Sequence, residues 1–386
     1  MLKRPSSFHK LSPSYLFPEI NRRKEAFLKE NPHVELLSLG IGDTVFPLPQ
    51  VIAKALEKGG AALGTKEGYV GYGQEQGNLK LRTMICERLY PHLTPDEIFI
   101  SDGAKSDIGR LQNLFGSQVR VGIQDPTYPV YVDGSILQGV QKITLLPCTA
   151  KNHFNPKIPK EIDLLYLCNP NNPTGKALSF EELAQIVDFA KTHSITILYD
   201  GAYFSYIQDP NLPKSIYDIP GAENVAIEVN SFSKMAGFSG IRLGWTILPK
   251  KLKFQCGHSI REDFLRFACT VFNGASNIAQ WGGEAVFSDE GWEAIQQPIQ
   301  YTMKNSKLLK KAFQKEGFTV HGGEHAPYLW IETPHRSSWE VFQEFMEKRH
   351  IIVTPGAGYG PSGEHFIRVS AFGFREKIES YLRELL

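Results

Sequence analysis

The feature that most constrains the fold is an alternation of apolar runs and amphipathic stretches across residues 51–272, without repeats or low-complexity segments. The runs at 98–101, 119–123, 163–168 and 195–199 are short and mostly apolar. Such runs are typical of strands buried on both faces of a parallel sheet. Their alternation with helical stretches predicts an α/β fold, with a mostly parallel central sheet and helices on both faces.

The length of 386 residues exceeds what one compact core usually holds, so two domains that share a cleft are expected. A helical stretch at 297–317 and apolar runs at 328–332, 351–353 and 366–369 predict a smaller α+β domain. The predicted boundaries are 1–45 for an N-terminal arm that joins the small domain, 46–274 for the large domain and 275–386 for the small domain.

Charge and cysteine usage exclude several classes of protein. The formal net charge is +1, from 42 basic and 41 acidic residues, without the positive excess that a nucleic-acid surface requires. The five cysteines form no Cys-x-x-Cys pair, which argues against disulfides, zinc knuckles and secretion. No apolar run has the length of a signal or membrane segment, and no His-Glu-x-x-His spacing occurs. We expect a cytoplasmic protein without nucleic acid, membrane or metal.

One lysine, Lys234, stands among small and hydroxyl residues in the stretch 230–242. A lysine in such company suits a Schiff base with a phosphorylated aldehyde. The amine reacts only when it is neutral, so its ordinary pKa of about 10.4 must fall by roughly 3 units, or about 4 kcal/mol, through burial and nearby cations. The alternative is a solvated Ser-Lys-Arg loop after a strand.

The spacing within this stretch gives a geometric prediction. On an extended backbone, Ser231 and Ser233 face one side and Lys234 faces the other, which would separate a phosphate grip from the imine. Arg242 adds a permanently charged fork that suits phosphate oxygens.

The run at 195–199 ends in Asp200, and Tyr203 follows one helical turn later. A carboxylate at a strand end can keep a pyridine nitrogen protonated, which makes the ring an electron sink. The tyrosine can donate to the phenolic oxygen of such a ring. The alternative is that Asp200 caps a helix after the strand.

The run at 163–168 leads into an Asn-Pro-Asn-Asn-Pro-Thr-Gly turn, which prolines and glycine make rigid. Asn172 in this turn can also reach the phenolic oxygen. By itself the turn only precedes a helix that Ser179 and Glu182 start with a capping box.

Two other strand ends fit the same pocket. The run at 98–101 leads into small residues at 102–107, where orphan amides of a helix N-terminus can bind phosphate. Tyr128, in the turn after 119–123, can stack on a flat ring for about 1 kcal/mol beyond area burial. An ordinary core position explains Tyr128 equally well.

With these parts in this order, the chain resembles the fold-type I pyridoxal-phosphate-dependent aminotransferases over nearly its whole length. Within them it is similar to the LL-diaminopimelate aminotransferase family. The Asn-Pro-Thr-Gly turn marks the broad class, and the blocks around Tyr15, Glu75 and Asn273 point to the narrower family. The blocks that carry the resemblance are 15–20, 39–44, 67–77, 230–242 and 272–277.

The resemblance implies that Lys234 forms the Schiff base with pyridoxal 5'-phosphate and later moves a proton between substrate and cofactor carbons. It implies that Asp200 holds the ring nitrogen, Tyr203 and Asn172 hold the ring oxygen, and Tyr128 stacks on the ring. The implied phosphate ligands are the amides of Ala104 and Lys105, the side chains of Ser231, Ser233 and Arg242, and Tyr72 of the partner subunit.

The resemblance also implies how substrate is held. Arg368 would pair with the reacting carboxylate, and Gly42 would let the backbone approach it. Diaminopimelate carries a second ammonium, from which Glu75 would accept a hydrogen bond. Composition alone favours a solvated loop position for Glu75. The implied ligands of the distal carboxylate are Lys105, Asn273 and Tyr15, and Tyr128 and Asn172 would also line the substrate site.

Because Glu75 and Asn273 would come from the other subunit, the resemblance implies a homodimer with shared active sites. The implied reaction interconverts LL-diaminopimelate and 2-oxoglutarate with tetrahydrodipicolinate, glutamate and water, in the synthesis of lysine and peptidoglycan precursors. Gly201 and Met235 depart from the family pattern, where a somewhat larger residue and an aromatic are usual.

Other interpretations stay open on sequence alone. One is an aminotransferase of aspartate or aromatic amino acids, or a pyridoxal-phosphate-dependent carbon-sulfur lyase. A second is a cofactor-binding regulator without turnover, which would need a DNA-binding domain that the roughly forty residues before the Gly42 block do not provide. A third is a chain in which the lysine stretch is structural and no cofactor binds.

Overall fold

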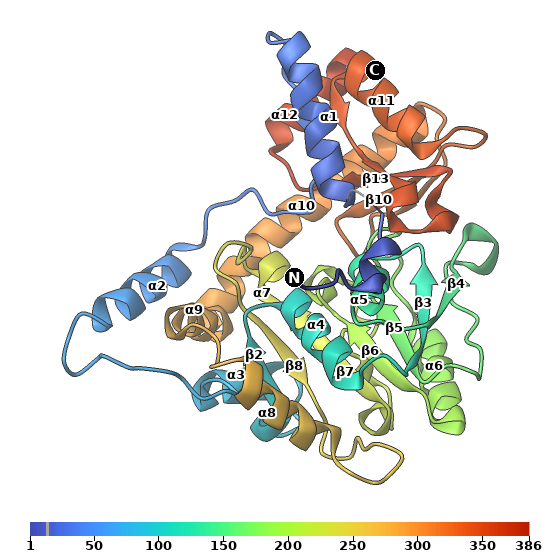
Figure 1. Cartoon of the computed structure of the whole chain (residues 1–386). Helices are drawn as coiled ribbons and strands as arrows, with labels where there is room; N and C mark the ends of the chain where they lie inside the picture. The colour runs from blue at the N-terminus through green and yellow to red at the C-terminus, as the bar shows by residue number, and fades with distance from the viewer. Residues whose placement is uncertain (13–14, 386) are drawn as a thin grey trace.

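The computed structural model describes residues 1–12 and 15–385, and Figure 1 shows a large sheet with helices around it and a second group of elements above it. The strands of the large sheet are β2 (Ile98–Ser101), β3 (Arg120–Asp125), β4 (Lys142–Pro147), β5 (Leu164–Cys168), β6 (Thr196–Asp200), β7 (Ala226–Ser231) and β8 (Gly244–Ile247). Their spatial order is β2-β8-β7-β6-β5-β3-β4.

The predicted fold class is confirmed, with one difference in strand pairing. Strands β4, β3, β5, β6 and β7 pair in parallel, whereas β8 runs antiparallel to both β7 and β2. The expectation that the strand at 98–101 pairs in parallel is therefore wrong. An apolar run indicates that a strand is buried on both faces, but it does not indicate whether the neighbouring strand runs parallel or antiparallel. Since β2 and β7 both oppose β8, the carboxyl ends of β2, β3, β5, β6 and β7 still share one edge.

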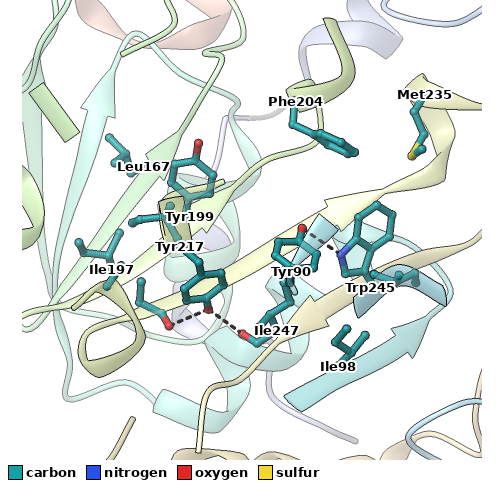
Figure 2. Close-up of a cluster of buried hydrophobic side chains, with 14 of the residues drawn as sticks. Tyr90, Ile98, Leu167, Ile197, Tyr199, Phe204, Tyr217, Met235, Trp245 and Ile247 are labelled. Atoms are coloured by element: carbon teal, nitrogen blue, oxygen red, sulfur yellow. Dashed lines mark hydrogen bonds between the residues drawn. The ribbon is translucent and has the colours of Figure 1, made fainter. Parts of the chain in front are cut away.

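Helices cover both faces of this sheet. Alternate residues of β5 and β6 enter two different apolar clusters, with Leu165 and Ile197 on one face and Leu164 and Leu198 on the other. The first cluster, part of which appears in Figure 2, also contains Trp245. The helices of this part of the chain are α2 (Gln50–Ala62), α3 (Leu79–Leu89), α4 (Ala104–Phe115), α5 (Val130–Leu137), α6 (Phe180–His193), α7 (Phe232–Met235), α8 (Ile260–Val271) and α9 (Asn277–Phe287).

A second, smaller group of elements has its own apolar core. It contains an antiparallel sheet in the order β12-β13-β10-β9 and a short parallel pair of β1 with β11. Its elements are α1 (Leu16–Glu30), β1 (Leu37–Ser38), β9 (Val320–Gly322), β10 (Tyr328–Glu332), α11 (Ser338–Arg349), β11 (Ile351–Ile352), β12 (Thr354–Pro355), β13 (Phe366–Ser370) and α12 (Arg375–Leu385).

Helix α10 (Asp289–Lys315) joins the two groups, since Ile295 lies in the core of the large sheet and Phe313 in the core of the smaller one. The helix begins at Asp289, earlier than the predicted start at 297. Sequence predicted the boundary between the two domains at residue 274. Because α9, which follows that residue, packs in the core of the large sheet, we propose instead that the boundary lies within α10. We also propose that the arm 1–45 belongs with the small domain. No helix in the described ranges is long and apolar enough to cross a membrane.

Candidate active site

A cavity of about 390 Å³ lies at the edge of the large sheet where the carboxyl ends of its strands meet. This is the edge at which open α/β sheets bind ligands, because the loops that follow the strands converge there. Residues that line the cavity are Ala104, Lys105, Ile108, Tyr128, Tyr131, Cys168, Asn172, Asp200, Ala202, Tyr203, Ser231, Ser233, Lys234, Ser239 and Arg242. Ten of the predicted site residues thus line one cavity, nine of them at or after the ends of five strands and Arg242 just before β8.

The backbone around Lys234 is not extended, so the prediction that it faces away from the serines is wrong. Strand β7 ends at Ser231, and α7 begins at Phe232. The Ser231 hydroxyl caps this helical turn by accepting from the backbone amide of Ser233 at 3.0 Å. The capped turn brings Ser231, Ser233 and Lys234 to the same cavity.

The environment of Lys234 agrees with the requirement for a reactive amine. Burial lowers the pKa of Lys234, and the guanidinium groups of Arg368 and Arg242 lower it further. Asp43 opposes both effects, because its Oδ1 lies 3.6 Å from the lysine Nζ. The net direction is downward, toward the neutral amine.

Asp200 is buried at the end of β6 and is held by two donors. The hydroxyl of Tyr131 donates to Oδ2 at 2.7 Å, and the backbone amide of Ala202 donates to Oδ1 at 3.0 Å. Burial raises the pKa of Asp200, and the two donors partly offset that rise. A positively charged ring nitrogen in the cavity would also stabilise the ionised carboxylate, as the two donors do.

Tyr203 lies three residues after Asp200, but no helical turn joins them. The chain makes a turn there, and a short 3₁₀ helix begins only at Phe204. The hydroxyl groups of Tyr203 and Tyr328 lie 2.8 Å apart, which ties this loop to β10 of the smaller sheet. Tyr203 thus lines the cavity from a loop and not from a helix.

The residues around the N-terminus of α4 fit a phosphate group. Gly103 caps the helix without a side-chain hydrogen bond, so the amides of Ala104 and Lys105 begin a helix with the orphan donors that bind anions. Arg242 Nη1 lies 3.4 Å from the Ser233 hydroxyl. Arg242 also adopts a φ of 67°, a left-handed conformation that non-glycine residues take mainly where the site demands it.

Arg368 of β13 is buried to 1% exposure beside the cavity. Its Nη1 donates to Asn172 Oδ1 at 2.8 Å, and its Nη2 donates to the Gly40 carbonyl oxygen at 2.7 Å. Because Asn172 accepts with its oxygen, its amide nitrogen is the group left to donate. Gly42 lies close to this arrangement, where a Cβ atom would stand 2.4 Å from the Tyr328 hydroxyl, so a side chain there would clash.

Lys105 extends from α4 toward two aromatic rings. Its Nζ lies 5.7 Å from the ring centre of Tyr15 and 5.6 Å from that of Tyr128, within the range of cation–π attraction. Burial is the largest cause that raises the pKa of both tyrosines, so both hydroxyls are neutral donors. The structure therefore brings Tyr15, Lys105 and Tyr128 together.

Three predicted residues lie away from this cavity. Tyr72 is 89% exposed and Glu75 is partly buried, and both belong to residues 63–78, the projecting segment that joins α2 to α3 (Figure 1). Asn273 is exposed and lies between α8 and α9. Asn277 donates to the Gly71 carbonyl oxygen at 3.1 Å, which holds the Asn273 block against this projection.

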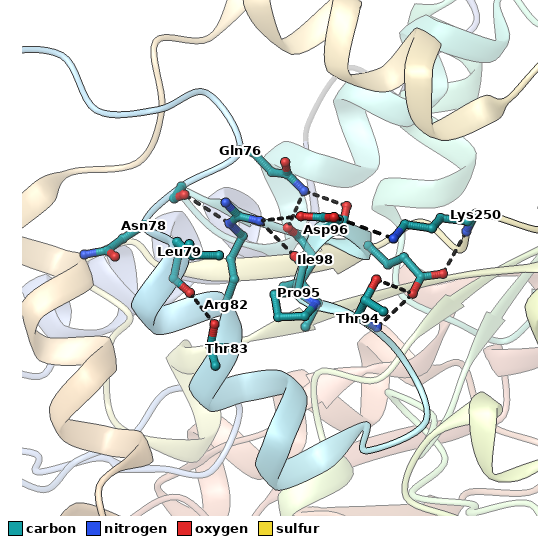
Figure 3. A network of polar contacts seen from close by, with 12 residues as sticks. Gln76, Asn78, Leu79, Arg82, Thr83, Thr94, Pro95, Asp96, Ile98 and Lys250 are labelled. Atoms are coloured by element: carbon teal, nitrogen blue, oxygen red, sulfur yellow. Dashed lines mark hydrogen bonds and ion pairs between the residues drawn. The ribbon is translucent and has the colours of Figure 1, made fainter.

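The base of the projecting segment is fixed to the large sheet by polar contacts (Figure 3). Gln76 donates to the carbonyl oxygen of Ile98 at 3.0 Å, and buried Arg82 donates to that of Gly77 at 3.1 Å. Main-chain pairing adds to this, since the amide of Ile100 donates to the Gln76 carbonyl oxygen at 2.9 Å. Tyr72 is therefore presented outward by an anchored segment.

Known proteins match this chain over almost all of its length. The family model for aminotransferase class I and II matches residues 34–385. The chain belongs to the class I and II aminotransferases. Pyridoxal phosphate is the cofactor of this family and of this chain.

Named relatives within the family share about half of their residues with the chain. An LL-diaminopimelate aminotransferase of Protochlamydia amoebophila is 48% identical, over 98% of this chain and 95% of the relative. The chloroplastic enzyme of that name from Arabidopsis thaliana is 48% identical, over 98% of this chain and 85% of the relative. The solved L,L-diaminopimelate aminotransferase from Chlamydomonas reinhardtii superposes with a TM-score of 0.95 at 47% identity, and the match covers 99% and 97% of the two chains.

Several residues of this aminotransferase site were not predicted from sequence. Tyr131 contacts Asp200, Asp43 contacts Lys234 and Tyr328 contacts Tyr203. Tyr131 follows Tyr128 by one helical turn and Asp43 adjoins Gly42, so sequence offered proximity to predicted residues as a signal. Sequence offered no such signal for Tyr328, because this residue starts a strand of the smaller domain.

Proposed function

We propose that the chain is an LL-diaminopimelate aminotransferase. The observation that carries this proposal is the cluster of Tyr15, Lys105 and Tyr128 beside a cavity that holds Lys234 and Asp200, in a chain that is 47% and 48% identical to enzymes of that name. The reaction interconverts LL-diaminopimelate and 2-oxoglutarate with tetrahydrodipicolinate, glutamate and water.

The cofactor would be held by residues from five strand ends and by Arg242, which precedes β8. Asp200 would pair with the ring nitrogen, Asn172 and Tyr203 would donate to the ring oxygen, and Tyr128 would stack on the ring. Arg242, Ser231, Ser233 and the first amides of α4 bind the phosphate. Bound pyridoxal phosphate supplies a protonated ring that withdraws electrons from the substrate's α-carbon.

The substrate is held at both ends. Arg368 pairs with the reacting carboxylate, and Gly42 leaves room for that group beside Tyr328. Lys105 and Tyr15 bind the distal carboxylate, together with the partner subunit's Asn273. The partner subunit's Glu75 accepts from the distal ammonium, which glutamate and aspartate lack.

We propose further that the protein is a cytoplasmic homodimer. Tyr69, Val70 and Tyr72 expose large side chains on the projecting segment, at 69%, 52% and 89%. Contiguous exposed apolar side chains on an anchored segment favour burial against another chain. In a symmetric dimer each projection reaches the partner's cavity, so Tyr72, Glu75 and Asn273 act in trans.

Half-reaction spectroscopy tests the proposed substrate. The protein loaded with pyridoxal phosphate is mixed with LL-diaminopimelate, glutamate, aspartate or cystathionine, and the cofactor absorbance is followed. Conversion with the first two compounds only is expected. Conversion with aspartate or cystathionine and not with diaminopimelate would assign the chain to another aminotransferase or to a carbon-sulfur lyase.

The variant Glu75→Gln sharpens this test, because it removes the charge that recognises the distal ammonium. The rate with diaminopimelate should fall by about a hundredfold, as for loss of a charged hydrogen bond worth about 2 to 3 kcal/mol, while the rate with glutamate changes little. Equal losses with both substrates would place Glu75 in a structural role.

A further inference from the structure

Asp43 is the only carboxylate within 4 Å of the Lys234 amine among the ion pairs of the described residues. The separation of Oδ1 from Nζ is 3.6 Å, and the lysine side chain is 18% exposed. The same Oδ1 accepts from the Thr44 amide at 2.9 Å and from the Ser239 hydroxyl. These donors fix the carboxylate in the direction of the lysine.

The backbone that carries Asp43 is attached to the smaller sheet. The amide of Leu39 donates to the Ile352 carbonyl oxygen at 2.8 Å, and the Gly40 carbonyl oxygen accepts from Arg368 and Thr354. Lys234, in contrast, belongs to α7 at the end of the large sheet. Asp43 therefore links the two parts of the molecule at the catalytic amine.

The charged groups around Lys234 come from every side of the cavity. Arg242 follows α7, Arg368 projects from β13 and Asp200 ends β6. Tyr203 lines the same cavity, and Tyr206 donates to the Lys234 carbonyl oxygen at 2.9 Å. The two guanidinium groups disfavour an ammonium, and both tyrosines have raised pKa values that keep them neutral.

We propose that Asp43 is a positioning residue that holds the Lys234 amine in the cavity and sets how tightly that amine keeps its proton. Burial and two guanidinium groups alone would make the amine a poor base. A fixed carboxylate restores proton affinity, so the lysine can hold a proton after it takes one from the substrate. The inference rests on the proposed role of Lys234 as the cofactor-binding lysine.

The test measures the amine directly in the full chain stripped of cofactor. Acetic anhydride labels only neutral amines, so the extent of Lys234 acetylation at each pH, read by mass spectrometry of its peptide, gives the midpoint of its titration. Asp43→Asn should move this midpoint down by about one unit, the low end for a close opposite charge because the Asp43 side chain is 48% exposed.

Two variants control this measurement. Asp102→Asn removes a carboxylate that precedes the N-terminus of α4 and pairs with Arg110, so the Lys234 midpoint should stay where it is. Asp43→Glu keeps the charge and should return the midpoint toward that of the unmodified protein. An unchanged midpoint in folded Asp43→Asn, or an equal shift in Asp102→Asn, would overturn the inference.

A separate reaction distinguishes this outcome from failure of the proposed function. Pyridoxal phosphate is added to the unmodified chain and reduced with borohydride, and the Lys234 peptide is examined for the bound pyridoxyl group. Absence of that group would reject the role of Lys234 in cofactor binding. Its presence with an unchanged Asp43→Asn midpoint would reject only the role of Asp43.

Discussion

At the scale of residues, chemistry depends on which polar groups each buried side chain finds. Lys234 was predicted from the small and hydroxyl residues around it and Asp200 from its place at a strand end, and both line the cavity. Burial shifts their pKa values in opposite directions, downward for the lysine and upward for the aspartic acid, because it disfavours the charged form of each. Their partners, Asp43 and Tyr131, restore part of the charged form.

The Lys234→Ala variant tests the central residue. It should still bind pyridoxal phosphate, because the phosphate and ring contacts come from other side chains, but steady-state transamination should fall by at least about a thousandfold, since nucleophile and proton carrier leave together. Dialysis, borohydride reduction and a transamination assay measure the three properties. Retained turnover would contradict the assignment.

The Tyr131→Phe variant tests the partner of Asp200. Loss of the 2.7 Å hydrogen bond to a carboxylate raises the pKa of Asp200 further and weakens its pairing with the ring nitrogen. Affinity for pyridoxal phosphate should fall by about tenfold or more, measured by titration of the cofactor-free protein, because such a bond contributes about 1.5 to 3 kcal/mol. An unchanged affinity would leave Tyr131 with a packing role only.

At the scale of elements, the departures from prediction have local causes. The Ser231 cap turns an expected extended segment into α7, and the loop after Asp200 replaces an expected helical turn. Helix α10 continues through Pro298, although proline favours a helix start near that point. In each case a side-chain hydrogen bond or tertiary packing outweighs local propensity.

The Gly201→Ala variant tests the packing of β6 against β7. A Cβ atom at Gly201 would lie 2.6 Å from Asn230 Oδ1, and Asn230 also donates to buried Glu228 at 2.7 Å. A side chain at position 201 would therefore require Asn230 to move. Thermal unfolding should show a loss of about 1 to 3 kcal/mol, as for overpacking.

A double-variant cycle supplies the control for that prediction. In the Asn230→Ala background the added methyl group meets no amide, so Gly201→Ala should cost little there. Equal costs in both backgrounds would mean that the strain arises elsewhere around Gly201.

At the scale of the whole molecule, the proposed active site is completed by residues from a second copy of the chain. We expect sedimentation to give twice the mass of 43.4 kDa. Lys234→Ala and Glu75→Ala, each nearly inactive with diaminopimelate, should regain about a quarter of normal activity when unfolded together and refolded, because half of the dimers then contain one intact site of two. Two Lys234→Ala samples treated in the same way are the control and should stay inactive.

Much of the molecule could be predicted from sequence. The apolar runs gave the strands and the class of fold because strand periodicity and burial are local properties of sequence. The ends of the predicted strands indicated Asp200, Asn172 and Tyr128, since loops after parallel strands converge at one edge, and the residues around Lys234 indicated the lysine. The residues proposed to bind the distal end of the substrate could be predicted only from the resemblance, because the sequence around a loop carboxylate such as Glu75 does not indicate what it binds.

Sequence by itself determined the alternating fold and the candidate residues of the cofactor pocket, because both follow from local pattern and residue chemistry. Only the tertiary structure decided that β8 reverses direction, that α7 brings Ser231, Ser233 and Lys234 to one cavity, and that Asp43 and Tyr328 approach from the smaller domain. These features depend on contacts between segments far apart in the chain, whose free energy no local pattern records.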